Sequence, residues 1–205
     1  CSAMSLPKQS FVQVAYLPEG CSWGNKVSRA DADHDGFEEL LFCGGGGAWL
    51  YEHIGNNRYA NPWVLGGIYL YMAVGDPDGD GLSDVLVRDW GDPTDTLLVW
   101  ESSSPDSFPN HVVWEAALPP ELCEVQITDL DGDGRQELLC IHPGQFYILE
   151  NTGDNTYEEV FRANIPHLET VGRASTGDFD CDGKNDFVTS SMEGHVFVYE
   201  NVGRG

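Results

Sequence analysis

Apolar residues along this chain come in short runs that are separated by glycine, asparagine, aspartate and proline. The runs are rich in β-branched and aromatic residues, which is typical of β-strands bounded by turns. Clear examples are Leu40–Phe42, Val85–Val87, Leu138–Ile141 and Phe187–Thr189. No segment sustains a 3.6-residue apolar period, so we expect an all-β protein with minimal helix.

The same succession of segments occurs four times. Each unit has a short strand, an acidic loop, an apolar strand, a third strand that ends near a glutamate, and a polar turn. In the first three units a fourth strand that begins with an aromatic residue then follows, at Tyr59, Phe108 and Tyr157. The acidic loops start at Asp31, Asp76, Asp129 and Asp178, roughly 50 residues apart, a period typical of propeller blades and other repeats.

Four strands in each repeat predict a β-propeller, and we expect residues 1–205 to form a single propeller domain. The last unit stops after its third strand, whereas a lone strand, Phe11–Tyr16, precedes the first unit. This N-terminal strand is expected to complete the last blade and close a ring of four blades without an open edge. The alternative is that the chain is part of a larger ring with six to eight blades.

The acidic loops 31–39, 76–84, 129–137 and 178–186 predict calcium sites. Carboxylates alternate at positions 1, 3 and 5, glycine at position 6 permits a sharp reversal, position 7 offers a backbone carbonyl, and position 9 returns a carboxylate. Calcium takes six to eight such oxygen ligands in a flexible shell. The predicted ligands are Asp31, Asp33, Asp35, Phe37 and Glu39; Asp76, Asp78, Asp80, Leu82 and Asp84; Asp129, Asp131, Asp133, Arg135 and Glu137; and Asp178, Asp180, Asp182, Lys184 and Asp186.

Three other interpretations of the loops were weighed. An EF-hand needs a glutamate at position 12 and flanking helices, but position 12 is Phe42, Val87, Cys140 or Thr189. Asp-rich turns without a metal would explain a single loop better than four repeated ones. Magnesium fits less well than calcium because it prefers a rigid octahedron with several water molecules.

The charge balance agrees with cation binding. The chain has 34 acidic and 10 basic residues, for a net charge of −24. Such an acidic protein is a poor partner for nucleic acid or an anionic membrane. No stretch is long enough to span a bilayer, and the longest apolar-rich segment, Val64–Val74, contains two glycines.

The six cysteines follow no zinc-binding spacing. Cys21 with Cys43, and Cys123 with Cys140, occupy similar places in their repeats and could form disulfides, although sequence cannot fix the pairing. Cys1 could carry a lipid, or it could be an ordinary residue. The six histidines form no recognisable partnership with a serine or cysteine nucleophile, so no catalytic residue is assigned.

The four acidic strings resemble the calcium-binding blades of integrin α-subunit propellers, the FG-GAP or VCBS repeat family. The turn segments after Glu150 and Glu200 are similar to those of bacterial VCBS-repeat proteins. This resemblance implies a propeller with calcium between the first and second strands of each blade. The chain departs from the family in lacking a clear Phe-Gly…Gly-Ala-Pro signature, in having fewer blades than the seven usual in integrins, and in placing Cys181, an expected exposed thiol, where glycine is common.

The expected function is a non-catalytic, monomeric binding module outside the cell or on its surface, with structural calcium and a protein or carbohydrate ligand. Candidate contacts are the insertion 89–93 with Trp90, and the region of Trp23 and Trp49, although tryptophans also fill spaces between blades. One alternative is a carbohydrate-active lyase or hydrolase. Another is a purely structural piece of a larger propeller.

Overall fold

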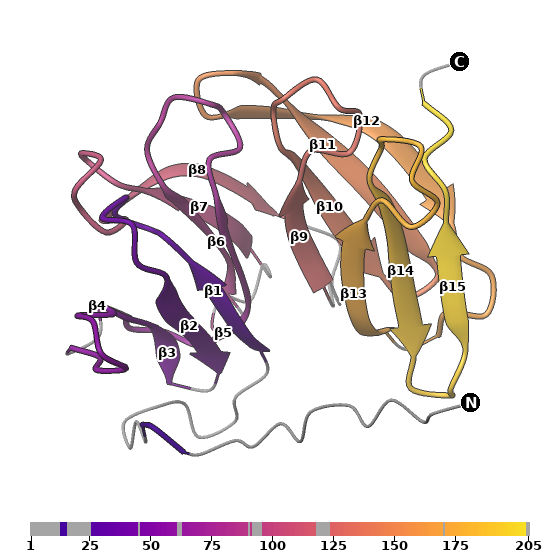
Figure 1. The fold of residues 1–205 in the computed structure, drawn as a ribbon. Coiled ribbons are helices and arrows are strands. Elements are labelled where there is room, and N and C mark those ends of the chain that lie inside the picture. Colours follow the sequence, from indigo (N-terminus) through magenta and orange to yellow (C-terminus); the bar gives the residue numbers. More distant parts are fainter. Residues whose placement is uncertain are drawn as a thin grey trace, which may run out of the picture.

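The computed structural model describes residues 13–15, 26–44, 46–60, 63–89, 91, 96–117, 124–169 and 171–203. These residues contain fifteen strands and no helix, in agreement with the predicted all-β class. The strands form four antiparallel sheets, which stand as the blades of a four-blade β-propeller (Figure 1). The described residues contain no helix that is long and apolar enough to cross a bilayer.

Each blade is an antiparallel meander whose strands pair in chain order. Blade 1 has β1 (Lys26–Ala30), β2 (Glu39–Gly44), β3 (Gly47–Tyr51) and β4 (Trp63–Leu65), and blade 2 has β5 (Tyr69–Gly75), β6 (Asp84–Asp89), β7 (Thr96–Glu101) and β8 (His111–Ala117). Blade 3 has β9 (Glu124–Thr128), β10 (Glu137–His142), β11 (Gln145–Gly153) and β12 (Thr156–Asn164), and blade 4 has β13 (Val171–Gly177), β14 (Asp186–Ser191) and β15 (Val196–Tyr199).

The fourth strand of the first blade is shorter than predicted. A strand beginning at Tyr59 is expected from the sequence, but β4 begins at Trp63 and Tyr59 makes only an isolated bridge to His53. The His53 ring stacks on Tyr59 at 5.1 Å and meets Phe37 edge-on. Local ring packing therefore replaces ladder pairing at this point.

The first strand of each later blade contacts the preceding blade: β5 contacts β1, β2 and β3, β9 contacts β5, and β13 contacts β9. An apolar cluster fills each junction. Trp63 and Trp100 pack at the junction of blades 1 and 2, and Trp114 at that of blades 2 and 3. These three tryptophans thus fill spaces between blades, whereas Trp23 and Trp90 lie outside the described residues.

The described part of blade 4 has three strands, and β15 pairs there only with β14. The predicted closing strand at 11–16 is described only at residues 13–15, which are not in a strand. Closure by the N-terminal segment therefore stays a prediction. Cys1, Cys21 and Cys123 also lie outside the described residues, so lipid attachment and the two disulfides stay predictions, although Cys43 and Cys140 are buried.

Candidate metal centres

The four acidic loops connect the first and second strands of their blades, where the sequence placed them. Their backbones share one hydrogen-bonded form. The position 6 glycines have φ between 86° and 93°, and the amides of Gly36, Gly81, Gly134 and Gly183 each donate to the position 1 aspartate at 3.0–3.1 Å. Because L-residues rarely adopt this φ, glycine is needed at position 6.

A second set of hydrogen bonds orients the carboxylate at position 5. Its Oδ1 accepts from the position 7 amide in every loop, for example at 2.8 Å from Phe37 to Asp35 and at 2.9 Å from Arg135 to Asp133. Leu82 and Lys184 donate in the same way. The predicted carbonyl ligands at these position 7 residues stay predictions.

Position 4 of the loop also requires a left-handed backbone. Glycine supplies it in two loops, but His34 (φ 58°) and Cys181 (φ 65°) occupy it in the others, at some cost in strain. Cys181 is an exposed thiol, as predicted. The His34 ring instead reaches the next blade, with Nε2 lying 3.4 Å from Ser83 Oγ.

The carboxylates at position 9 are the buried members of the loops. Glu39, Glu137 and Asp186 each accept a hydrogen bond from the amide at position 2 of their own loop, at 2.6, 2.6 and 3.2 Å. The second loop has Pro77 at position 2, and proline has no N–H to donate. Its position 9 residue, Asp84, therefore lacks this partner.

Asp84 is only 1% exposed, yet neither carboxylate oxygen has a hydrogen-bond partner. Burial, with Asp78 and Glu101 as the nearest charges, raises the pKa of Asp84 to about 8. A buried, unpaired carboxylate is costly in free energy, and a cation is the partner that its surroundings lack. This side chain is the strongest sign of a metal site in the chain.

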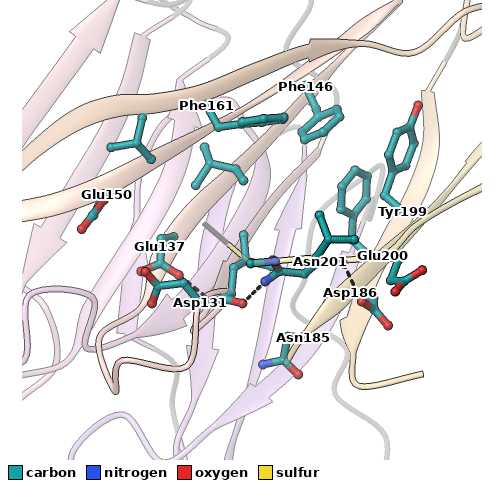
Figure 2. Close-up of a pocket in the computed structure, with 16 residues that line it drawn as sticks. Asp131, Glu137, Phe146, Glu150, Phe161, Asn185, Asp186, Tyr199, Glu200 and Asn201 are labelled. Atoms are coloured by element: carbon teal, nitrogen blue, oxygen red, sulfur yellow. Dashed lines mark hydrogen bonds between the residues drawn. The ribbon is translucent and has the colours of Figure 1, made fainter. Parts of the chain in front are cut away.

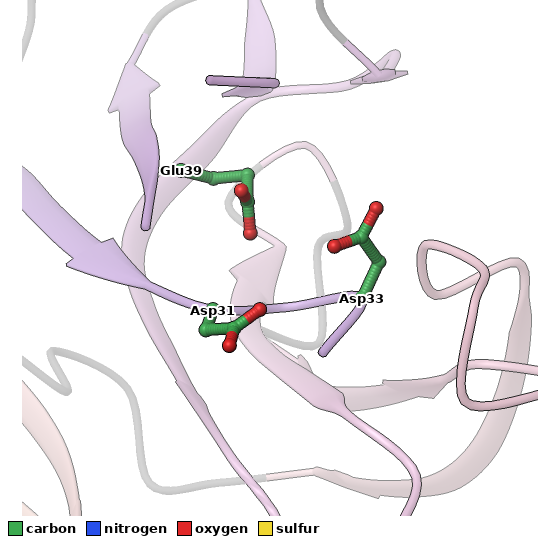
Figure 3. A group of neighbouring side chains, drawn as sticks. All are labelled: Asp31, Asp33 and Glu39. Carbon is green, nitrogen blue, oxygen red and sulfur yellow. The ribbon is translucent and has the colours of Figure 1, made fainter. Parts of the chain in front are cut away.

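Carboxylate oxygens converge in the first three loops. Asp31, Asp33 and Glu39 bring oxygens within 4.8 Å of one another (Figure 3), and the same holds for Asp76, Asp78 and Asp84 and for Asp129, Asp131 and Glu137. Burial, with neighbouring carboxylates, raises the pKa of both Glu39 and Glu137 to about 7. The set is one of hard oxygen ligands, which suits a divalent cation such as Ca²⁺.

Three further carboxylates, Glu52, Glu101 and Asp154, join these groups although they are not among the ligands predicted from the sequence. Glu52 lies with Asp35 and Glu39, and Glu101 with Asp78 and Asp154. Glu101 is directly opposite Asp84 on the β6–β7 ladder. The signal was present in the sequence, because every third strand is followed by or ends in a glutamate.

The fourth loop differs from the others in its balance of charge. The Lys184 ammonium contacts Asp182 Oδ2 at 2.7 Å and, with its hydrogen bonds, lowers the pKa of Asp182. Asp178 and Asp180 are exposed, whereas Asp186 is buried. A cation in this loop would compete with the lysine for the position 5 carboxylate.

A cavity of about 540 Å³ lies between blades 3 and 4 beside the third loop (Figure 2). Phe146, Phe161 and Tyr199 form part of its apolar wall, and Asp131 and Glu137 of the third loop reach its edge. Phe161 is half exposed. Apolar walls with a few polar groups at one side are typical of ligand-binding cavities.

The comparisons with known proteins agree with this architecture. Residues 129–189 match the family model described as FG-GAP-like repeat, so the chain contains an FG-GAP-like repeat within a β-propeller. No curated protein matches the chain.

Among the solved structures that share the fold are two with a TM-score of 0.58. One is BBS1N in complex with ARL6DN (TM-score 0.58, 15% identity, 87% of this chain and 52% of that chain). The other is a lectin of Agrocybe aegerita that recognises non-reducing terminal N-acetylglucosamine (TM-score 0.58, 16% identity, 90% of this chain and 51% of that chain). The chain thus spans about half the length of either neighbour.

Proposed function

We propose that this protein is a calcium-dependent, non-catalytic binding module in which the ions hold the first hairpin of each blade in its folded form. The observation that carries the proposal is Asp84, a buried carboxylate with no hydrogen-bond partner at the last position of an acidic loop. An ion at that point would remove the free-energy cost of its burial. The proposed ligands are the residues predicted for the four loops.

Calcium is favoured over magnesium by the ligand set. The loops offer many carboxylates at irregular positions around a flexible turn, and calcium accepts six to eight oxygens without strict octahedral geometry. We further propose that the protein acts outside the cell or at its surface. Calcium is abundant there, and extracellular modules work with sites of only 10⁻⁴–10⁻³ M affinity.

The binding role rests on the cavity between blades 3 and 4. Its aromatic wall, with Phe146, Phe161 and Tyr199, suits the apolar face of a sugar ring or a side chain of a protein partner. A propeller of the same fold recognises a terminal N-acetylglucosamine, which supports a carbohydrate as the first ligand class to test. The proximity of Asp131 and Glu137 to this cavity would make ligand binding depend on the ion in the third loop.

Chelation tests the structural role. The full chain is melted with calcium and with a chelator, and bound metal is counted by elemental analysis. Because an ion that binds only the folded state stabilises it by mass action, the melting temperature should fall sharply without calcium. An unchanged melting temperature, together with no bound metal at millimolar calcium, would overturn the proposal.

A glycan array tests the binding role. The protein is applied with calcium and with a chelator, and Phe161→Ala serves as the variant because this half-exposed ring lines the cavity. Val196→Ala, an exposed apolar residue that is not among those lining the cavity, is the matched control. Calcium-dependent sugar binding that only Phe161→Ala weakens supports the assignment, and binding that both variants retain would place the ligand elsewhere.

A further inference from the structure

The turn between β11 and β12 of blade 3 docks on the acidic loop of blade 2. Asn155 makes this contact twice: its backbone N–H donates to Asp78 Oδ2 at 3.1 Å, and its side-chain Nδ2 donates to Glu101 Oε1 at 2.6 Å. Asn155 has a left-handed backbone, with φ 48°. The turn is therefore held against two carboxylates of a neighbouring blade.

This docking adds a carboxylate from blade 3 to the group in blade 2. Asp78, Glu101 and Asp154 bring oxygens within 4.8 Å of one another, and Asp78 also belongs to the group of the loop itself with Asp76 and Asp84. The two oxygens of Asp78 face different sides: Oδ1 accepts from Asp80 inside the loop, and Oδ2 accepts from Asn155 of blade 3. Each carboxylate oxygen has a second lone pair, so Asp78 can ligate an ion on both sides.

Burial makes this group costly without a cation. Glu101 is only 8% exposed, and Asp84, which lies opposite it on the ladder, is 1% exposed with no partner for either oxygen. Asn155 Oδ1 is also buried without a hydrogen-bond partner. The nearby base is His111, whose Nε2 lies 3.7 Å from Glu101 Oε2. Like charges on directly opposed residues are destabilising, and a single imidazole does not balance them.

The negative charge at the junction of blades 2 and 3 is larger than one divalent ion can neutralise. Two groups that share Asp78 make up this junction, and with Asp80 they place six carboxylates there: Asp76, Asp78, Asp80, Asp84, Glu101 and Asp154. One divalent ion in the loop would leave four formal negative charges. Carboxylates that bridge two ions about 3.5–4 Å apart are a known solution to this problem.

We propose that the junction of blades 2 and 3 holds a second divalent cation, ligated by Asp78 Oδ2, Glu101, Asp154 and Asn155 Oδ1, next to the ion of the second loop. The inference rests on the proposed function, because Asp78 would ligate both the ion of the second loop and the ion at the junction. Its ligands come from two blades, so this ion joins blade 2 to blade 3, whereas the loop ions act within a blade.

The test counts calcium bound to the full chain after equilibrium dialysis against millimolar Ca²⁺. Asp154→Asn should bind one ion fewer than the wild type, and Glu101→Gln, which keeps an oxygen acceptor for Asn155, should lose the same ion. Glu115→Gln removes one negative charge from an exposed position on β8 and should bind as many ions as the wild type.

Asp131→Ala separates this inference from the proposed function, because it removes a predicted ligand of the third loop only. If Asp131→Ala loses an ion while Asp154→Asn and Glu101→Gln keep the wild-type number, the junction site is wrong and the calcium loops stand. If the wild type itself binds no calcium, the proposed function fails first and the junction site fails with it. Circular dichroism checks that every variant is folded.

Discussion

The Lys184 ammonium lies 2.7 Å from Asp182 Oδ2, so one predicted ligand of the fourth loop already has a cationic partner. Both side chains are about one-third exposed, so solvent screens this ion pair and keeps its contribution to stability small. We therefore expect the four loops to differ in affinity for a cation, although their sequences share one pattern.

Lys184→Ala should strengthen calcium binding in the fourth loop by roughly two- to fivefold, which is the affinity equivalent of losing that ion pair. Isothermal titration of the full chain measures the change. Arg135→Ala is the control, because it removes a positive charge from the same position of the third loop, where no carboxylate contact is seen among the described residues. Equal effects of the two variants would mean that net charge, rather than the ion pair, sets the affinity.

Asp84→Asn should act in opposite directions with and without calcium. In a chelator at a pH above 8, where the Asp84 carboxyl with its pKa of about 8 is ionised, the variant should melt above the wild type, because a buried, unpaired carboxylate has been replaced by a neutral amide. With calcium it should gain less from the ion than the wild type does. Thermal melts of the variant and the wild type, in chelator and in calcium, measure both effects. A variant that melts below the wild type in the chelator would contradict the assignment of Asp84 as a metal ligand.

The stability of the metal-free protein should fall as the pH rises from about 5 to about 8. Burial raises the pKa of Glu39 and Glu137 to about 7 and that of Asp84 to about 8, whereas unfolded carboxyls titrate near 4. The folded state therefore keeps protons that the unfolded state has lost, and this contribution disappears as pH passes through the folded pKa values.

Calcium should reverse this trend, because the ion competes with those protons and binds more tightly at higher pH. Melts at pH 5, 6, 7 and 8, in chelator and in calcium, give the comparison. Parallel curves in the two conditions would show that these carboxylates are not ligands.

Gly134→Ala should destabilise the protein by about 1–2 kcal/mol and weaken the third calcium site, because Gly134 has φ 93°, where an L-residue is strained. No atom lies within 4 Å of the added Cβ, so the effect comes from the backbone alone. Gly153→Ala is the control: Gly153 lies in β11, also with open space, and has no such φ. Denaturant unfolding with and without calcium measures both variants.

Deleting residues 1–16 tests closure by the N-terminal strand. Val196 and Val198 on β15 are 67% and 65% exposed, and a strand added at this edge would cover them. If residues 11–16 form that strand, the truncated chain should melt at a lower temperature, and the amides of β15 should exchange hydrogen faster. If hydrogen exchange of the β15 amides is the same in the truncated chain, residues 11–16 do not pair with β15.

The acidic loops could be predicted from the sequence because their carboxylates lie within nine residues of one another. The role of glycine at position 6 follows from local geometry, and the structure confirms it at Gly36, Gly81, Gly134 and Gly183. Glu52 and Glu101 were missed as members of the acidic groups because their position depends on the register between the second and third strands. That register places Glu101 opposite Asp84, and no spacing within a loop reveals it.

Contacts between blades could not be predicted from the sequence. The docking of Asn155 on Asp78 joins residues 77 positions apart, and it depends on how one blade is rotated relative to the next. Trp114 of blade 2 likewise packs against Tyr157 of blade 3, with ring centroids 5.0 Å apart. Sequence periodicity predicts what each blade contains, whereas the angle between blades decides which side chains meet across a junction.

Among the described residues, each blade is joined to the next by first strands that contact in succession: β1 with β5, β5 with β9, and β9 with β13. At the junction of blades 1 and 2, β2 and β3 also contact β5, so the loss of blade 1 would expose more of its neighbour than first-strand contacts alone suggest.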